Sequence, residues 1–252
     1  MNAFATAIQT SPEAAPTPRD LLTAASLTAQ LDGADPRQII QTAQRLLGDR
    51  LAVVSSFGTE SAVLLKLVAD VDPSLPVLFL DTLWLFKETL AYRDQLVARL
   101  ALTDVRTVMP SPSALALRDP KRELCFHDRD ACCGMRKVEP LAKELVAFDG
   151  WISGRKRYHG GERTALPVVE ADGPRLKFNP LAPLARGEID AVFAAAKLPR
   201  HPLEGLGFSS VGCVPCTHRP PANGDLRSGR WGGLGKTECG IHAGPLPDPA
   251  KS

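Results

Sequence analysis

The fold is decided by one stretch, Leu51-Ala52-Val53-Val54-Ser55-Ser56-Phe57-Gly58-Thr59-Glu60-Ser61-Ala62-Val63-Leu64-Leu65-Lys66-Leu67-Val68. Residues 51–56 are a short apolar run that ends at a polar turn, which is the pattern of a buried strand. Residues 61–68 follow that turn with a helical pattern. Strands that lead into helices in this way indicate a parallel sheet with helices on both of its faces.

The same order of strands and helices continues on both sides of this stretch. Upstream, residues 36–47 are predicted to form a helix, with Asp35 as N-cap, Pro36 at its first position and Gly48 just after its end. Downstream, strands are predicted over residues 76–80, 105–108, 151–154 and 177–181, and helices over residues 87–100 and 140–147. We therefore expect an α/β fold whose ligands bind where the carboxyl ends of the strands meet the helix N-termini.

Composition changes along the chain divide it into four regions. Residues 1–20 are rich in Ala, Thr and Pro without periodicity, so we expect a flexible N-terminal arm. Residues 21–204 hold the predicted strands and helices of the α/β domain. Residues 205–242 are loop-rich and contain three cysteines, and we expect a mobile C-terminal segment of the same domain, followed by a tail over residues 243–252.

The overall composition is that of a globular protein without a strong charge. The chain has 252 residues, 44% of them hydrophobic, and a net charge of +2, which favours neither bulk nucleic-acid nor membrane binding. The first twenty residues lack the pattern of a signal peptide, and no stretch has the roughly 18 apolar residues of a transmembrane helix. We expect a cytoplasmic protein, in which six cysteines serve metal binding or catalysis.

Four of the cysteines form two close pairs. Cys132 and Cys133 are adjacent, and Cys213 and Cys216 form a CxxC motif, which together give the four thiolates of an iron–sulfur cluster or a zinc site. Adjacent helical side chains diverge by about 100°, which favours a cluster several ångströms wide over a single ion. Two other interpretations remain at this point, a redox-active CxxC and separate buried cysteines. Cys125 has no partner in this scheme and is expected to be a buried free thiol.

Cys239 stands apart from both pairs, close to the C-terminus. Four glycines lie upstream between residues 229 and 235, which suits a thiol that must meet two partners. Lys236 and His242 favour its thiolate, whereas Glu238 opposes it. On residues alone, such a cysteine is either a catalytic nucleophile or an exposed thiol without a role.

Two features indicate an anion site. The turn over residues 55–59 offers hydroxyls and backbone N–H groups before a helix, although it also fits an ordinary capped loop and is not a Walker A motif. Basic residues, which are more often solvated surface, here lie beside cysteine motifs or after predicted strands. These residues are Arg136, Lys137, Arg155, Lys156, Arg157, Arg163, Arg227 and Arg230.

Taken together, these motifs resemble those of the assimilatory phosphosulfate reductases, specifically the iron–sulfur type of adenylyl-sulfate (APS) reductase. The resemblance runs from about Val53 to His242. The related reductases of the 3′-phosphorylated substrate (PAPS) usually lack both cysteine pairs, so the pairs favour APS. The matching motifs are residues 55–61, Leu80-Asp81-Thr82, the CC pair with residues 136–140, residues 212–217, residues 227–231 and the final Glu238-Cys239-Gly240-Ile241-His242.

The resemblance implies a fold, a cofactor and a set of site residues. The fold is that of the adenine-nucleotide alpha-hydrolases, and the catalytic residue is Cys239. One 4Fe–4S cluster is held by Cys132, Cys133, Cys213 and Cys216. Lys137 links this cluster to the substrate. The substrate-binding residues also include Ser55, Ser56 and Thr82 around the nucleotide and Arg163, Arg227, Arg230 and His242 around the phosphosulfate.

Two positions depart from the family pattern. After Leu80-Asp81-Thr82 the family usually has Gly and a basic residue, whereas this chain has Leu83 and Trp84. A Gln-Ser-type stretch after the fourth strand is replaced by His159-Gly160-Gly161. These departures bear on the geometry of nucleotide binding and on the alignment of Arg163.

The expected reaction is a reduction in sulfate assimilation. Cys239 takes the sulfonyl group from APS and releases AMP, and thioredoxin or a similar dithiol then releases sulfite. The alternatives are a PAPS reductase and an ATP-pyrophosphatase-type sulfurtransferase, although the loop lacks the usual SGGxDS pattern of the latter. A zinc-stabilised nucleic-acid-binding module is disfavoured by the aromatic content of 6%. The sequence leaves the oligomeric state open, and a homo-oligomer is one possibility.

Overall fold

A single six-stranded sheet forms the centre of the fold. The computed structural model describes residues 17–221, 224–231 and 238–242. Neighbouring strands pair in parallel except for β5 and β6, which are antiparallel. In spatial order the strands are β3 (Val105–Val108), β2 (Val77–Leu80), β1 (Leu51–Ser55), β4 (Gly150–Ile152), β6 (Arg175–Phe178) and β5 (Val169–Asp172).

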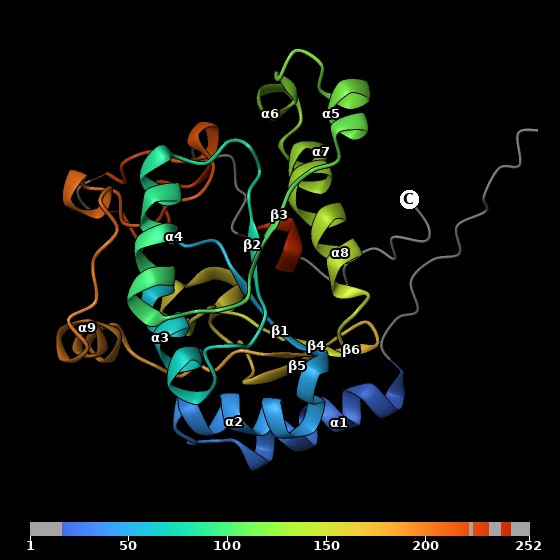
Figure 1. Ribbon diagram of the computed structural model, residues 1–252, viewed down its shortest axis with the longest axis vertical. Coiled ribbons are helices and arrows are strands. Elements are labelled where there is room, and N and C mark those ends of the chain that lie inside the picture. The colour runs from blue at the N-terminus through green and yellow to red at the C-terminus, as the bar shows by residue number, and fades with distance from the viewer. Residues whose placement is uncertain (1–16, 222–223, 232–237, 243–252) are drawn as a thin grey trace, which may run out of the picture.

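The helices are short to medium in length and lie around this sheet (Figure 1). A π-helical segment, η2 (Gly134–Val138), joins two of them. The α-helices are α1 (Pro18–Gln30), α2 (Pro36–Leu47), α3 (Ser61–Val71), α4 (Lys87–Leu100), α5 (Pro112–Arg118), α6 (Leu124–His127), α7 (Arg129–Cys133), α8 (Glu139–Leu145) and α9 (Arg186–Ala195).

Both faces of the sheet are buried at its centre, which explains why β2 is apolar throughout and β1 is apolar up to Ser55. Along β1, Leu51 and Val53 belong to one core, whereas Ala52 and Val54 belong to the other. The first core contains residues of α2, α3, α4 and α9, and the second contains residues of α8. Figure 1 shows α3 and α4 on one side of the sheet and α8 on the other. The expected α/β fold with a parallel, two-sided sheet is confirmed.

Several predicted elements have the expected bounds. Helix α2 begins after Asp35, whose side chain accepts hydrogen bonds from the first turn, and it ends before Gly48, which has a φ of 52°. Helix α4 and strand β3 also match the predicted ranges. Strand β4 begins one residue earlier than predicted and ends at Ile152.

Other elements were not predicted. Helix α1 begins at Pro18, inside the region expected to be a flexible arm, and residues 1–16 lie outside the described part. Strand β5 was not predicted, because two of its four residues are acidic and its place depends on pairing with β6. Helix α9 was also missed. None of the described helices is long and apolar enough to span a membrane.

The described part of the C-terminal segment packs against the rest of the fold. Isolated bridges pair Leu85 with Cys213 and Thr217 with Arg230. Ile241, in the short 3₁₀ turn η8 (Gly240–His242), is buried in the second core. The segment therefore meets the carboxyl ends of β1 and β2, where the sequence predicted a ligand site.

Candidate active site

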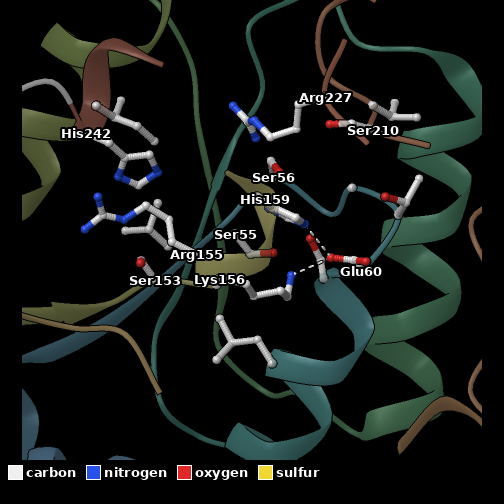
Figure 2. Close-up of a pocket in the computed structure, with 18 of the residues that line it drawn as sticks. Ser55, Ser56, Glu60, Ser153, Arg155, Lys156, His159, Ser210, Arg227 and His242 are labelled. Carbon is white, nitrogen blue, oxygen red and sulfur yellow. Dashed lines mark hydrogen bonds and ion pairs between the residues drawn. The ribbon is translucent and has the colours of Figure 1, made fainter. Parts of the chain in front are cut away.

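A pocket lies at the carboxyl end of β1 (Figure 2). Its walls come from three parts of the chain that are distant in sequence. The turn after β1 contributes Ser55, Ser56, Gly58, Thr59 and Glu60, the loop after β4 contributes Ser153, Gly154, Arg155, Lys156, His159 and Arg163, and the C-terminal segment contributes Ser210, Val211, Arg227, Arg230, Ile241 and His242.

The turn after β1 is held in an unusual backbone conformation. Phe57 has a φ of 48°, in the left-handed region that non-glycine residues rarely adopt. Its ring is fully buried and packs edge-on against Phe79, with ring centroids 5.2 Å apart. Its N–H donates to Ser55 Oγ at 3.2 Å. Packing thus fixes this turn, so its hydroxyls and N–H groups are held in place before α3 begins.

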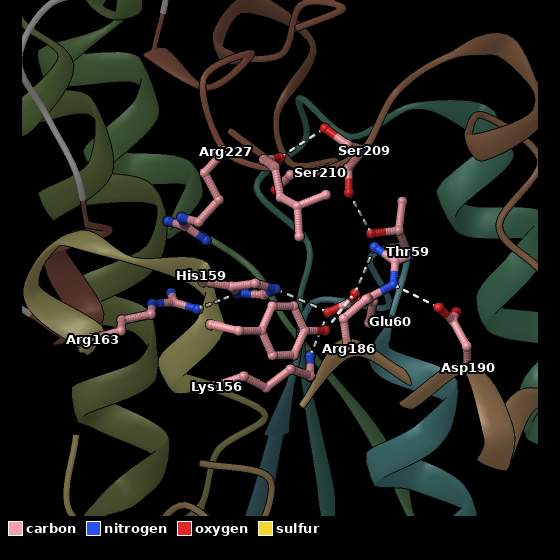
Figure 3. A network of polar contacts seen from close by, with 12 residues as sticks. Thr59, Glu60, Lys156, His159, Arg163, Arg186, Asp190, Ser209, Ser210 and Arg227 are labelled. Carbon is pink, nitrogen blue, oxygen red and sulfur yellow. Dashed lines mark hydrogen bonds and ion pairs between the residues drawn. The ribbon is translucent and has the colours of Figure 1, made fainter. Parts of the chain in front are cut away.

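Glu60 is the centre of a buried polar network beside this turn (Figure 3). Lys156 Nζ lies 2.8 Å from its carboxylate and His159 Nε2 lies 2.9 Å from it. The hydroxyl of Tyr158 donates to the same carboxylate at 2.6 Å. Glu60 therefore holds the loop after β4 against the turn after β1.

The charges in this network are determined by its burial. Burial opposes the charge on Glu60, but the hydrogen bond from His159 and the charge of Lys156 lower the pKa of its carboxyl. Burial lowers the pKa of His159 to about 4, so its imidazole is neutral at pH 7. A neutral ring donates to Glu60 through Nε2 and accepts from Arg163 Nη1 at 3.0 Å through Nδ1. Burial also lowers the pKa of Lys156.

A second buried carboxylate lies beside two arginines of the pocket. Arg163 Nε and Nη2 donate to the two oxygens of Glu238 at 2.5 and 2.7 Å. Arg227 Nη2 lies 3.5 Å from Glu238 Oε1. Burial opposes the charge on Glu238, but the hydrogen bonds and charge of Arg163 lower its pKa to about 2. Burial lowers the pKa of Arg227 to about 10, which leaves it charged at pH 7.

His242 forms part of the pocket wall opposite Glu60 (Figure 2). Its ring stacks on Trp151, with centroids 5.8 Å apart and planes inclined by 13°. Burial and the nearby charges of Lys177 and Arg155 lower its pKa, so the imidazole is neutral. Its Nδ1 is buried and has no hydrogen-bond partner among the described residues.

The pocket as a whole is cationic. Among the residues that the structure describes, its lining includes one lysine and four arginines, and Glu60 is its one carboxylate. Arginine forks suit ligands that present several oxygens, such as phosphate and sulfate. The cations are Arg155, Lys156, Arg163, Arg227 and Arg230.

The four paired cysteines line a separate, small cavity together with Cys125. All five cysteines are buried, and none of them forms a disulfide. Trp84, Arg136 and Lys137 also line this cavity. The predicted grouping of the CC pair with the CxxC motif is thus present in the structure, and Cys125, expected to be a separate buried thiol, is buried against the same cavity.

Local structure explains how the two motifs meet. Cys132 and Cys133 end α7, where the chain passes into the π-helix η2, a wider turn that is often found at functional sites. Cys216 belongs to a 3₁₀ turn, η6 (Val214–Cys216), whose first N–H donates to Trp84 O at 2.7 Å. These contacts place both motifs beside the chain segment that follows β2.

The lining of this cavity, with two pairs of buried thiols, has the donor set of a four-thiolate metal site. Among the described residues, no group of three or more His, Cys, Asp and Glu is placed to hold one metal ion. A tetrahedral zinc site needs four ligands within about 2.3 Å of one point, whereas a cluster reaches thiolates spread around its surface. Burial raises the pKa of Cys132 to about 11, and neighbouring Arg136 acts in the opposite direction. The positive charge of Arg136 therefore lies close enough to stabilise a thiolate at Cys132.

Cys239 lines neither the pocket nor the cysteine cavity, but it packs against Cys213 and Cys216 of that cavity, and Ile241 and His242 just after it line the pocket. It is partly buried and packs against both the second core and the cluster of Cys213, Cys216 and Trp231. Lys137 Nζ lies 3.9 Å from its sulfur. A hydrogen bond from Cys133 and the charge of Lys137 lower the pKa of Cys239, although burial opposes this. The residue has the features of an activated thiol.

The structure brings most predicted site residues together. Thr82 differs, because it is fully buried and its hydroxyl contacts Cys213 Sγ at 3.2 Å instead of lining the pocket. Lys137 likewise lines the cysteine cavity. Arg157 is not a lining residue, and its Nε donates to Leu166 O. The predicted residues that line the pocket are Ser55, Ser56, Arg163, Arg227, Arg230 and His242.

The two departures from the family pattern have structural explanations. Leu83 has a φ of 60°, the conformation that glycine adopts freely, so the backbone keeps its shape without the glycine. Trp84 lies against the cysteine cavity, and the guanidinium of Arg122 lies 4.6 Å from its ring centroid. His159 donates one hydrogen bond and accepts another, as the amide of a glutamine does.

Comparisons with known proteins agree with these observations. Residues 50–219 match the family described as the phosphoadenosine phosphosulfate reductase domain. An adenosine 5′-phosphosulfate reductase of Mesorhizobium japonicum is 47% identical over 88% of this chain and 88% of that protein. A phosphoadenosine 5′-phosphosulfate reductase of Gloeobacter violaceus is 40% identical over 89% of this chain and 95% of that protein.

A solved structure shows the same fold. The phosphoadenylyl-sulfate reductase of Candida auris, crystallised with phosphate, superposes with a TM-score of 0.64 at 24% identity. The match covers 75% of this chain and 93% of that chain. This match confirms the expected fold over most of the chain, in addition to the order of the strands.

Proposed function

The chain belongs to the phosphoadenosine phosphosulfate reductase family, and on that basis we propose that it reduces adenosine 5′-phosphosulfate (APS) to sulfite and AMP in sulfate assimilation. The observation that supports this most directly is the position of Cys239, a partly buried thiol that packs against two cysteines of the cavity and is followed by Ile241 and His242, which line the cationic pocket. The name of the Mesorhizobium relative, at 47% identity, supports APS as the substrate.

The pocket holds the substrate through its phosphosulfate group. Ser55 and Ser56 bind near the phosphate from the turn before α3, and Thr82 supports the site from the cysteine side. Arg227 and Arg230, with Arg163 and His242, contact the oxygens of phosphate and sulfate. Their charges offset the negative charge that gathers on these oxygens as the sulfur–oxygen bond breaks.

The first chemical step is a transfer of the sulfonyl group to the enzyme. The Cys239 thiolate attacks the sulfate sulfur, a new S–S bond forms, and the bond from that sulfur to the bridging oxygen breaks. AMP leaves with the electron pair of the broken bond, and Cys239 carries a thiosulfonate. Lys137, whose ammonium is 3.9 Å from the Cys239 sulfur, stabilises the attacking thiolate.

The second step needs an external dithiol such as thioredoxin. One of its thiolates attacks the Cys239 sulfur and expels sulfite, which leaves a mixed disulfide. The second thiol of the reductant resolves this disulfide and restores the Cys239 thiol. The two electrons that reduce the sulfur therefore come from the dithiol, and thiols that stay reduced suit a cytoplasmic enzyme.

We also propose that Cys132, Cys133, Cys213 and Cys216 hold one 4Fe–4S cluster, since all four line one cavity with three basic side chains. When bound, the cluster supplies charge and positioning beside the substrate, because the dithiol already provides the electrons. In this proposal residues 21–204 form the nucleotide-binding domain, and residues 205–242 are its cluster-binding and catalytic segment.

Replacement of the nucleophile tests the reaction. Cys239→Ser should keep iron and bind APS but release no sulfite, because a serine hydroxyl is a poor nucleophile at neutral pH. Mass spectrometry of the wild-type protein with APS and no reductant should show one added SO₃ group on Cys239. Sulfite release by Cys239→Ser at the wild-type rate would refute the proposal.

A second candidate is the reductase of the 3′-phosphorylated substrate. It is favoured by the Gloeobacter relative, a phosphoadenosine 5′-phosphosulfate reductase that is 40% identical over nearly its whole length. Sulfite release from APS and from its 3′-phosphorylated form, measured with the same dithiol, separates the two. An ATP-pyrophosphatase-type sulfurtransferase is the remaining alternative, and AMP release from ATP in place of APS would indicate it.

A further inference from the structure

Glu238, the residue before the proposed nucleophile, contacts two arginines of the pocket lining and the backbone of Cys239. Its side chain is buried, with 4% exposure, and the side chain of its main partner Arg163 is 9% exposed. Two parallel hydrogen bonds of 2.5 and 2.7 Å join the carboxylate to the Arg163 guanidinium. This two-pronged geometry is the most specific that an arginine and a carboxylate can form.

The same carboxylate also fixes the backbone of the nucleophile. Cys239 N–H donates to Glu238 Oε1 at 2.9 Å. On the other side of the cysteine, Ile241 is buried in the second core. Gly240 passes so close to η2 that an added Cβ would lie 3.0 Å from a methyl group of Val138. Cys239 is therefore held from both sides, by an ion pair before it and by packing after it.

Arg163 connects this ion pair to the substrate pocket. It lines the pocket and donates to His159 Nδ1, and His159 in turn contacts Glu60. The pocket wall and the residue before the thiol are thus joined by the Arg163–Glu238 ion pair, beside which Arg227 contacts the same carboxylate at 3.5 Å. Breaking this ion pair leaves a buried charge without its main partner, which is costly, so the docked position is strongly preferred.

We propose that Glu238 is a positioning residue, whose ion pair with Arg163 docks the Cys239 segment so that the thiol faces the bound substrate. The proposal rests on the function proposed above and adds the contact that aligns its nucleophile. The sulfonyl transfer needs the docked position, in which reacting atoms meet in the right geometry. The later attack by a dithiol needs the Cys239 sulfur exposed, so this contact opens between the two steps.

The test compares Glu238→Gln with the wild-type protein and with Glu144→Gln, a change at an exposed glutamate of α8. The first readout is the alkylation of Cys239 by iodoacetamide, located by mass spectrometry and taken at the alkaline plateau, where thiolate formation is complete. Glu238→Gln should raise this plateau rate about 5-fold or more, because opening of the segment becomes easier. Glu144→Gln should match the wild type.

The second readout is the single-turnover transfer of SO₃ from APS to Cys239 without reductant. Glu238→Gln should slow it about 10- to 100-fold, since alignment is lost, while APS affinity changes far less. Equal alkylation rates in Glu238→Gln and the wild type would overturn the proposal, as would an unchanged rate of transfer. A wild-type protein that accepts no SO₃ refutes the proposed function, while the alkylation readout still tests the docking contact.

A variant of the partner residue, Arg163, tests the same contact in case Glu238→Gln does not fold. Arg163→Lys keeps the charge but loses the two-pronged contact, and it should raise the alkylation plateau to a similar degree. Iron content and the thermal midpoint are measured for each variant. A folded Arg163→Lys protein that is alkylated at the wild-type rate contradicts the proposal.

Discussion

The ammonium of Lys137 lies 3.9 Å from the sulfur of Cys239, although 102 residues separate the two in the chain. Lys137 follows the CC pair in η2, and burial opposes its charge. Nearby Cys213, Cys239 and Cys133 nevertheless raise its pKa, so it stays protonated. One cation therefore serves both the cysteine cavity and the proposed nucleophile.

Removal of this cation should weaken the nucleophile. Lys137→Ala is expected to slow SO₃ transfer from APS to Cys239 about 100-fold, the usual effect of losing one well-placed charged donor. Without the nearby positive charge the pKa of Cys239 should rise, so iodoacetamide alkylation at pH 7 should also slow. Rapid-quench mass spectrometry measures both rates, and Lys143→Ala, at an exposed position of α8, is the control. Equal rates in all three proteins would exclude this role for Lys137.

The cysteines should divide into two classes by their effect on iron. Cys213→Ser is expected to remove the iron and the activity together, because a cluster needs all four thiolates. Cys125 lines the same cavity but is outside the two pairs. Cys125→Ser should therefore keep iron and sulfide at the wild-type content, which chemical analysis of anaerobically prepared protein measures. Loss of iron from Cys125→Ser alone would show that the ligand set is wrong.

A glycine beside the CxxC motif keeps room for one of the pocket arginines. A Cβ on Gly212 would lie 2.2 Å from Arg230 Nη2 and 2.7 Å from its Cζ, which forces the guanidinium to move. Gly212→Ala should raise the KM for APS about 10-fold, since one charge-assisted contact is lost. Gly205→Ala is the matched control, because nothing lies within 4 Å of its added Cβ. An unchanged KM for Gly212→Ala would show that Arg230 does not contact substrate.

Elements with strong local signals were predictable from the sequence. Helix α2 has an N-cap, a proline and a terminal glycine in order, and its bounds match the prediction. Strand β5 was missed because Glu170 and Asp172 interrupt its apolar pattern. Asp172 is buried there because it accepts a hydrogen bond of 2.7 Å from Trp151 Nε1, a partner that no local pattern identifies.

Some residues of the site were likewise predictable from local spacing, whereas others were not. Spacing alone identified Cys213 and Cys216 as a pair, because a CxxC turn directs both sulfurs to one side. The role of Glu60 was missed, since its partners Tyr158 and His159 lie 98 and 99 residues further along the chain. The one available signal was the basic run after the fourth strand. If such a run is buried, a carboxylate must lie close enough to pair with its charges.

Burial of His159 makes the stability of the protein depend on pH. Its pKa is about 4 in the folded state, mainly because burial disfavours the charged ring, against about 6.5 in an unfolded chain. An unfolded chain therefore takes up this proton first as the pH falls. The contribution of His159 to stability is complete above about pH 6.5 and is lost progressively towards pH 4, by up to about 3 kcal/mol.

His159→Gln should reduce this dependence, because glutamine can make both hydrogen bonds of the neutral ring but does not titrate. Between pH 4 and 6.5, the slope of the free energy of unfolding against pH should fall by up to about 1.4 kcal/mol per pH unit. Urea denaturation at a series of pH values measures the slope. His127→Gln, at an exposed histidine, should leave it as in the wild type. Identical slopes for His159→Gln and the wild type would mean that His159 is protonated in the folded protein, and that Glu60 is paired with an imidazolium instead of a neutral ring.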